Sequence, residues 1–408
     1  MANVDNKNDK TIRTYIDLFA GCGGLSLGLH LSGWKGLFAI EKSPFAFQTL
    51  KYNLIDSKNH FSWPEWLECK EHDIVEILKK YKLQLNELQG KVDLVVGGPP
   101  CQGFSMAGKR MVDDFRNELV YSYIEFIKLV KPKLILFENV NGFTYAFKNK
   151  ETDEKTVPYS QIVIERLQAL GYNVKDHMID FSNYGVPQKR VRFILVGSLK
   201  NNADNFITVI KEMKNYFLKN KGLNQKATVS DAISDLLSNN GTLPTPDRKG
   251  FFSGLYSEPK SRYQTVMRKG CARKDTIADS HSFAKHRKET LELFTRLLNK
   301  YPQKNKRVKN SDRIKWNIQK RSITILDGSK QSPTLTSHPD DYIHYSEPRI
   351  LTVRECARIQ SFPDWYKIRE RYTTGGQNRK NEVPRYTQIG NAIPPLFSEL
   401  AGLALWRM

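Results

Sequence analysis

The sequence predicts an α/β protein with a doubly wound, mostly parallel sheet, followed by a smaller, irregular and basic region. Two observations predict the sheet. Short apolar runs alternate with helical patterns through the first 198 residues, and turns bearing glycine or proline follow the runs. The irregular region is predicted because this alternation stops after Gly197, where Lys, Arg, Asn and Ser become frequent.

The positions of the expected strands fix where a ligand would lie. They are residues 14–21, 37–43, 91–98, 132–140 and 190–197, and the helical patterns are residues 25–34, 122–131 and 161–171. In doubly wound sheets ligands lie at the carboxyl ends of the strands, so we expect the turns at these ends to form the site. Beyond residue 198 we expect one amphipathic helix, residues 288–301, and ordered segments at 349–362 and 388–406.

The composition indicates a soluble protein with an anionic partner. Of the 408 residues, 39% are hydrophobic and 26% charged, and no apolar run reaches the length that spans a bilayer. The first residues are polar and lack the apolar core of a signal peptide, so a cytoplasmic location is expected. The net charge of +21 suits a polyanion, although a solubility feature or a Lys- and Asn-rich genome bias gives the same number.

The cysteines draw attention to one position. There are five, widely spaced and without a CxxC pair, so we expect neither a disulfide framework nor a metal site. Four of them are expected to be small hydrophobic residues. The fifth, Cys101, stands in GGPPCQGFS, where Pro99 and Pro100 fix the backbone before it. A buried structural cysteine needs no such support, whereas a nucleophilic thiol does, because attack depends on geometry.

A glycine-rich turn, DLFAGCGGLSLGL (17–29), follows the first strand. Gly21 and Gly23 occupy two places of a dinucleotide fingerprint, but Ser26 occupies the third. Glu41 ends the second strand, where a carboxylate can accept hydrogen bonds from ribose hydroxyls. The turn therefore predicts a nucleoside cofactor; a turn that only packs a helix on a strand stays an alternative.

Two further strand ends carry charged residues. Glu138, in FENV, ends an apolar strand, where a carboxylate can have a raised pKa and can exchange a proton. The alternative is an acid in an ordinary salt bridge. QKRVRF places Gln188, Arg190 and Arg192 at alternating positions, so on a strand they face one side, where two guanidinium groups can hold phosphate or carboxylate.

In this order the motifs resemble those of the C5-cytosine DNA methyltransferases, over nearly the whole chain. The resemblance adds the triplet 72–74, RECARIQSFPDWY (354–366) and QIGNAIPPLFSELAG (388–402). Relatives that methylate an exocyclic amine carry an aromatic residue where Cys101 stands, so the cysteine favours methylation of carbon. The resemblance implies the Rossmann-like fold of the S-adenosylmethionine-dependent methyltransferases. It also implies a catalytic domain of residues 1–198, completed by 385–408, and a target-recognition domain of residues 199–384.

For catalysis, the resemblance implies that the Cys101 thiolate adds to C6 of a cytosine. Glu138 would hold the ring at N3 and the exocyclic amine, while C5 takes a methyl group from S-adenosylmethionine. Arg190 and Arg192 would support the flipped nucleotide or the loop of residues 102–116, which would close over it. Because C6 cannot be reached in a stacked duplex, the base must be extruded.

The resemblance also assigns binding residues. Glu41 would bind the ribose hydroxyls, Asp73 the adenine amine and Ile74 the adenine ring. Other residues expected around the cofactor are Phe19, Gly21, Gly23, Leu25, Pro99, Leu119, Asn391 and Ala392. Residues expected to contact DNA are Gln102, Ser105, Gln188, Thr334 and Thr336.

Double-stranded DNA is the expected substrate and a monomer the expected state. A cytosine methyltransferase acting on transfer RNA, and a DNA-binding protein without activity, stay alternatives. The compact size predicts an enzyme of a bacterial or phage restriction–modification system, with a cognate restriction endonuclease as partner. The irregular region offers no readable code for the recognised DNA sequence.

Overall fold

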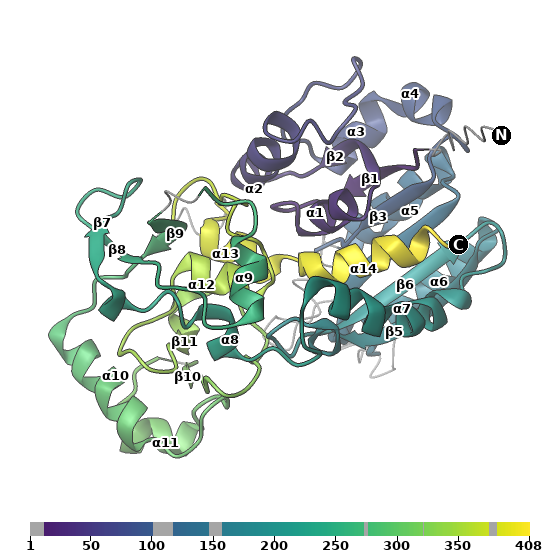
Figure 1. Cartoon of the computed structure of the whole chain (residues 1–408). Coiled ribbons are helices and arrows are strands. Elements are labelled where there is room, and N and C mark those ends of the chain that lie inside the picture. Colours follow the sequence, from purple (N-terminus) through teal and green to yellow (C-terminus); the bar gives the residue numbers. More distant parts are fainter. Residues whose placement is uncertain (1–11, 101–116, 147–156, 273–275, 321, 375–381) are drawn as a thin grey trace, which may run out of the picture.

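The computed structural model describes residues 12–100, 117–146, 157–272, 276–320, 322–374 and 382–408. Its centre is a six-stranded sheet in the order β2-β1-β3-β4-β6-β5 (Figure 1). Helices cover both faces of this sheet, so the predicted fold class is confirmed. The strands are β1 (Thr14–Leu18), β2 (Lys35–Ile40), β3 (Leu94–Gly97), β4 (Leu134–Val140), β5 (Asn173–Asp180) and β6 (Val191–Ser198).

One strand of the sheet runs against the others. β1, β2, β3 and β4 pair in parallel, whereas β6 pairs antiparallel with both β4 and β5. The start of β6 therefore lies at the same edge as the carboxyl end of β4, with Val140 opposite Arg192. Because β6 runs in this direction, the strand meets the predicted ligand edge where it begins, next to the QKRVRF segment, and not where it ends.

The predicted strand boundaries need two corrections. The first strand was expected over residues 14–21 but ends at Leu18, because Phe19 takes a left-handed φ of 58° that a strand does not allow. β5 was not predicted. It is an edge strand with exposed charged residues such as Lys175 and Asp176, so it lacks the apolar run by which the other strands were recognised.

Alternating strand residues face two apolar clusters, one on each side of the sheet. Ile16 and Val95 face one cluster, and Tyr15 and Leu94 face the other, as the two-residue period of a strand requires. The helices of this part are α1 (Gly24–Leu31), α2 (Pro44–Leu50), α3 (Ile74–Lys80), α4 (Lys82–Glu87), α5 (Asn117–Val130), α6 (Tyr159–Ala169), α7 (Asn205–Lys221) and α14 (Pro395–Leu405).

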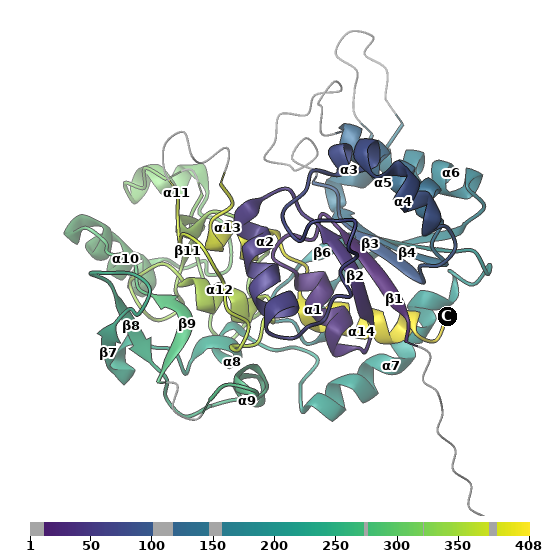
Figure 2. The same ribbon diagram turned by 90° about the horizontal axis from the view of Figure 1, so that it is seen from above.

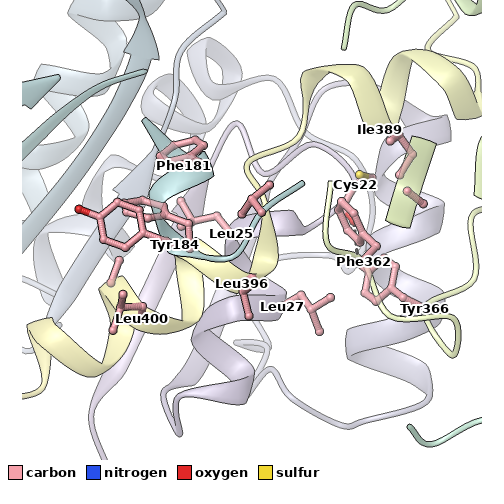
Figure 3. Close-up of a cluster of buried hydrophobic side chains, with 14 of the residues drawn as sticks. Cys22, Leu25, Leu27, Phe181, Tyr184, Phe362, Tyr366, Ile389, Leu396 and Leu400 are labelled. Carbon is pink, nitrogen blue, oxygen red and sulfur yellow. Dashed lines mark hydrogen bonds between the residues drawn. The ribbon is translucent and has the colours of Figure 1, made fainter. Parts of the chain in front are cut away.

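The C-terminal helix α14 packs directly on α1, and both views show the two helices side by side (Figures 1 and 2). The contact is close because Gly28 has no side chain: a Cβ there would lie 2.2 Å from the Cβ of Ser398. Trp34 donates an indole hydrogen bond of 3.0 Å to the Gly402 carbonyl. Figure 3 shows Leu25 and Leu27 of α1 in one buried cluster with Leu396 and Leu400 of α14.

The remaining residues form an irregular part with two small sheets. Its helices and strands are α8 (Val229–Ile233), α9 (Arg262–Arg268), α10 (Lys288–Lys300), α11 (Asn310–Lys315), α12 (Val353–Ile359), α13 (Arg385–Asn391), β7 (Thr242–Pro244), β8 (Phe252–Leu255), β9 (Ile277–Ser282), β10 (Thr324–Ile325) and β11 (Tyr342–Ile343). Short helical turns are η1 (Lys51–Asp56), η2 (Asn141–Thr144), η3 (Phe181–Tyr184), η4 (Ser238–Asn240) and η5 (Pro339–Asp341). Within the described ranges, none of the helices combines the length and the apolar character that crossing a bilayer requires.

The predicted amphipathic helix at 288–301 is present as α10. The apolar cluster on the α1 face continues into α8, α9, α12 and α13, so one core joins the sheet to the irregular part. α10 packs instead in a small separate core, to which β10 contributes Ile325 and β11 contributes Ile343. The predicted division at residues 198 and 384 stays a prediction.

Helix α12 carries a buried ionic network. The Arg358 guanidinium binds Asp235 and Asp364, with shortest distances of 2.6 Å to each, and all three side chains have no exposed surface. Arg354 donates to Asp279, and Arg349 forms two hydrogen bonds of 2.7 and 2.8 Å to Glu355. We call this set the arginine network; it connects α12 to segments more than 100 residues away.

Candidate active site

The glycine-rich turn between β1 and α1 has the backbone that its sequence predicts. Gly21 and Gly23 have φ values of 56° and 85°, a region that side chains rarely allow. A Cβ at Gly21 would meet no atom within 4 Å, so open space lies beside the turn. Ser26, in the third fingerprint place, donates a hydrogen bond of 2.5 Å to Asp17. This contact explains why a serine stands there.

Glu41 lies against this turn at the end of β2. Its carboxylate accepts hydrogen bonds from the backbone N–H of Gly21 (2.8 Å) and of Ser43 (2.7 Å). Burial raises the pKa of the Glu41 carboxyl, and the backbone hydrogen bonds offset part of that rise. The N–H of His72 donates to the Glu41 carbonyl at 2.8 Å, so the next predicted residue, Asp73, lies beside this strand end.

Asp73 begins helix α3 and caps it, accepting from the Val75 N–H at 2.9 Å. Its other oxygen pairs with Lys42 at 2.7 Å. Burial opposes ionisation of Asp73, but the Lys42 and Val75 contacts hold its pKa below the usual value. The predicted ligands of the ribose and the adenine amine are thus neighbours, and each carboxylate oxygen of both residues already has one partner in the protein.

The apolar residues predicted for the cofactor divide between the two faces of the sheet. Phe19 and Leu119 are half-buried and Ile74 is buried, and all three belong to one cluster. Leu25 and Ala392 belong to the cluster on the opposite face, where Leu25 is only 4% exposed. A Cβ at the intervening Gly24 would lie 3.4 Å from the Ala392 Cβ, so the C-terminal segment contacts the glycine turn. Gly23 is buried and Asn391 is exposed.

Gly98, Pro99 and Pro100, which precede Cys101, form a segment that we call the proline elbow, and it begins beside Glu138. A Cβ at Gly98 would lie 2.8 Å from a Glu138 carboxylate oxygen, so only glycine allows this approach. Asn139 donates a hydrogen bond of 3.3 Å to the carbonyl of Pro99, which is buried. Cys101, Gln102, Ser105 and the loop of residues 102–116 lie outside the described residues. Cys101 is nevertheless bonded to Pro100, the last described residue of the elbow.

Glu138 faces cations at the start of β6. The Arg192 Nε lies 3.0 Å from a Glu138 oxygen, and both side chains are largely buried. Burial raises the pKa of the Glu138 carboxyl, and the charges of Arg192 and Arg190 offset only part of that rise. Arg190 is buried and donates to the carbonyls of Leu335 (3.5 Å) and Gly390 (3.1 Å). Among the described residues, its Nε has no hydrogen-bond partner.

The strand expected from QKRVRF needs a correction. β6 begins only at Val191, so Gln188 and Arg190 precede it. Gln188 has no exposed surface and accepts a hydrogen bond of 2.9 Å from the Leu335 N–H. Arg190 holds backbone carbonyls and Arg192 holds the Glu138 carboxylate, so the two arginines do not grip one common anion.

The threonines predicted for DNA contact lie on the segment after β10. The Thr334 hydroxyl donates to the Lys189 carbonyl, and the exposed Thr336 hydroxyl donates to Asp341, both at 2.7 Å. This segment therefore borders the edge that carries Arg190 and Glu138. The phosphate contacts themselves stay predictions.

Asp17, a buried acid beneath the glycine turn, is a residue that sequence reasoning missed. It is 1% exposed at the end of β1, and burial raises the pKa of its carboxyl to about 7 despite the Ser26 hydrogen bond. The available signal was an acid inside an apolar strand, nine residues before a serine in a glycine position.

Comparison with known proteins identifies the family of this chain. The family model of the C-5 cytosine-specific DNA methylases matches residues 13–403. The type II methyltransferase M.DdeI of Desulfomicrobium norvegicum is 30% identical over 395 residues, which cover 94% of this chain and 86% of that protein. M.XorII of Xanthomonas oryzae pv. oryzae, also a type II methyltransferase, is 30% identical over 407 residues, covering 95% of this chain and 83% of that protein.

A solved structure from an E. coli prophage, described as a DNA modification methyltransferase, shares the fold. It has a TM-score of 0.61 and 23% identity, and the match covers 97% of this chain and 99% of that one. The family match spans almost the whole chain and includes every motif that forms the site. The chain therefore belongs to the C-5 cytosine-specific DNA methylase family.

Proposed function

We propose that this enzyme transfers a methyl group from S-adenosylmethionine to C5 of a cytosine flipped out of duplex DNA, with Cys101 as nucleophile. The observation that carries the proposal is the approach of Gly98 and Pro99 to Glu138. The residue that follows this elbow is a cysteine, and the carboxylate beside it has a raised pKa. A thiol and a proton donor together are what addition to a pyrimidine ring needs.

The glycine turn supports S-adenosylmethionine as cofactor. Open space lies beside Gly21, and each Glu41 oxygen accepts one backbone hydrogen bond, which leaves capacity for ribose hydroxyls. Phe19 and Ile74 offer apolar surface for an adenine ring. When bound, S-adenosylmethionine would supply an electrophilic methyl group.

The proposed steps use four side chains of this protein: two react with the ring, and two position them. The Cys101 thiolate forms a bond to C6, and the displaced electron pair is stabilised when Glu138 donates a proton to N3. C5 then takes the methyl group as the methyl–sulfonium bond of the cofactor breaks, and afterwards loses its own proton to solvent water. The C6–S bond breaks, the thiolate leaves, and N3 returns its proton to Glu138. Arg192 positions the Glu138 carboxylate, and Arg190 ties the strand start to the C-terminal segment.

Duplex DNA in a restriction–modification system is the proposed context. The relatives named above are type II methyltransferases, and the net charge of +21 suits a phosphate backbone. We also propose that the protein acts as a monomer and that a cognate restriction endonuclease recognises the same site.

The first test is transfer of tritiated methyl groups from S-adenosylmethionine to unmethylated bacterial duplex DNA and to transfer RNA. We expect label in the DNA alone. Label in transfer RNA alone would replace the substrate, and no label in either would contradict the enzyme proposal. Bisulfite sequencing of DNA from expressing cells would then identify the methylated cytosine.

The second test addresses the nucleophile. Cys101→Ser should abolish transfer while duplex binding persists, and a substrate with 5-fluorocytosine at the target should trap a covalent complex with the native protein only. Near-normal turnover of the serine variant would show that Cys101 is not the nucleophile. Glu138→Gln should lower kcat by roughly 10²–10⁴-fold, because it removes proton donation to the ring.

A further inference from the structure

A short segment carries a large share of the positive charge. Residues 285–320 contain twelve Lys and Arg against three Asp and Glu, a net charge of +9 out of +21 for the whole chain. The segment is less than a tenth of the sequence but holds more than two fifths of the net charge. It comprises α10, α11 and their connections, and we call it the basic lobe.

The charges of the basic lobe are held on an ordered platform. Phe294, Leu297 and Tyr301 pack with Val308 and Ile318 in a small core of their own. On α10, the exposed positions 288, 292, 296 and 300 follow one another at four-residue spacing and so line one face of the helix. Three of these four residues are cations, which gives the helix a basic stripe opposite its apolar side.

The lysines of the basic lobe are largely unneutralised. Lys288, Lys300, Lys306, Lys309 and Lys315 are exposed, and none of them forms an ion pair with a described carboxylate. In contrast, Lys320 forms an ion pair with Asp340 at 3.0 Å. Surface lysines without partners create a field that attracts a polyanion, and the basic stripe on α10 adds to this field.

Side-chain contacts connect the basic lobe to the active-site edge. Asp340, the partner of Lys320, lies in the segment where Thr336 binds Asp341 and Thr334 binds the Lys189 carbonyl. Lys189 precedes the two arginines of the site. Figure 2 shows α10 and α11 at the end of the molecule remote from β3 and β4. A duplex with its target base at the site would therefore meet the lobe in its flanking part.

We propose that the basic lobe binds the phosphates of duplex DNA that flanks the target site and supplies affinity that does not depend on sequence. This inference rests on the proposed function, because it names a second contact surface for the same substrate. Phosphate contacts position a protein on DNA without reading bases, so the lobe holds the duplex while other residues select the sequence.

The test compares two variants that lose the same charge. The lobe variant carries Lys288→Gln, Lys300→Gln, Lys306→Gln and Lys309→Gln. The control variant carries Lys79→Gln, Lys82→Gln, Lys91→Gln and Lys219→Gln, four exposed lysines of the sheet region that form no ion pair with a described carboxylate. Binding of a 40-base-pair duplex of random sequence is measured by fluorescence anisotropy over a salt series, and methyl transfer to bacterial DNA is measured in parallel.

We expect the lobe variant to bind the duplex about tenfold or more weakly in roughly 0.1 M salt. The slope of log K against log salt should fall by about 0.9 for each lost phosphate contact, roughly 3.6 in total. The control variant should keep the native slope. KM for DNA should rise in the lobe variant while kcat at saturating DNA stays unchanged, and unfolding midpoints should match because all substituted residues are exposed.

Equal slopes for the lobe variant and the native protein would overturn the inference, as would an equal loss in the control variant. Weaker binding of transfer RNA with unchanged duplex binding would also overturn it. If no methyl transfer occurs but the lobe variant alone loses duplex affinity, the proposed function fails and the basic lobe stands as a DNA-binding surface.

Discussion

Buried arginines serve two opposite purposes in this protein. In the arginine network, the five N–H donors of Arg358 all have acceptors, shared between Asp235, Asp364 and the Ala232 carbonyl. At the active-site edge, one carboxylate faces two arginines, and the buried Arg190 Nε has no partner among the described residues. Every N–H donor of Arg358 in the arginine network therefore has an acceptor, whereas a buried donor at the active-site edge has none among the described residues.

The pKa shifts of Glu355 and Asp364 follow the same contrast, whereas burial raises the pKa of Asp235 in spite of Arg358. Burial alone would raise the pKa of Glu355 in the arginine network, but Arg349 holds it at about 2. At the sheet edge burial dominates, and it raises the pKa of Asp17 to about 7 and that of Glu138 above its usual value. Fully paired charges fix a structure, whereas groups with shifted pKa values and free donors can act on a substrate.

Breaking the arginine network should have the largest effect on stability. Arg358→Met leaves the buried Asp235 and Asp364 only the more distant Arg268 (3.7 Å) and Arg354 (3.8 Å), so we expect the free energy of unfolding to fall by about 3–5 kcal/mol. Urea denaturation measures it. Lys128→Met, which breaks an exposed pair with Glu125, should cost less than about 1 kcal/mol. Similar losses in both variants would remove the contrast between buried and surface pairs.

The two regions should respond to pH with opposite signs. Asp17 retains its proton in the folded state up to about pH 7, so its contribution to stability is complete below about pH 4 and is lost as pH rises through 7. Glu355 contributes stability above about pH 4.5, and that contribution is lost as pH falls towards 2. Each effect is on the order of 3 to 4 kcal/mol.

Urea denaturation between pH 3 and 8 separates these contributions. Asp17→Asn should remove the loss of stability between pH 4 and 7, and Glu355→Gln should flatten the loss below pH 4.5. An Asp17→Asn profile parallel to the native one over pH 4–7 would show that burial does not hold the proton on Asp17.

A change at the proline elbow should affect activity more than stability. Gly98→Ala places a methyl group within 2.8 Å of a Glu138 oxygen, so the carboxylate must move. We expect kcat to fall on the order of 100-fold, since displacements below an ångström misalign reacting groups. Methyl-transfer kinetics and urea denaturation are compared with Gly90→Ala, where a Cβ meets nothing within 4 Å. That control should lose stability by about 1 kcal/mol and keep its activity.

The smallest expected effect comes from removing a single hydrogen bond to an acid of the arginine network. Tyr256 donates a hydrogen bond of 2.6 Å to Asp364, which keeps its bonds from Arg358 when the hydroxyl is removed. Tyr256→Phe should lower the free energy of unfolding by about 1.5 kcal/mol. Tyr216→Phe, at a side chain that is 70% exposed, should change it by less than about 0.5 kcal/mol. Equal changes in the free energy of unfolding for the two variants would mean that the Tyr256–Asp364 hydrogen bond does not stabilise the fold.

Much of the fold could be predicted because apolar runs mark strands that are buried on both faces. β3 and β4 are such strands, and their glycine and acidic ends indicated the site edge. β5 lacks the signal because its residues are partly solvent-exposed. The direction of β6 depends on how it connects and pairs, not on its own residues, so its reversal could not be read from the sequence.

The residues of the site also divide into those that the sequence predicted and those that it did not. Glu138 was predicted because its acid follows an apolar run, and the elbow was predicted from its prolines. The Arg192–Glu138 pair joins residues of two strands, and the Arg358–Asp235 pair joins residues 123 positions apart. One sequence contains no periodicity that reports such pairings, because side-chain partners are set by packing.

The contact between α13 and the glycine turn has a consequence for synthesis of the protein. The sulfur of Cys22, in the glycine turn, lies 3.5 Å from the Gln388 carbonyl, 366 residues later. At roughly 5–20 residues per second, a ribosome takes roughly 20–70 seconds to make the intervening chain. Until then the turn lacks its C-terminal support, so a nascent chain cannot complete it. We therefore expect activity to appear only after the segment around Gln388 has been translated.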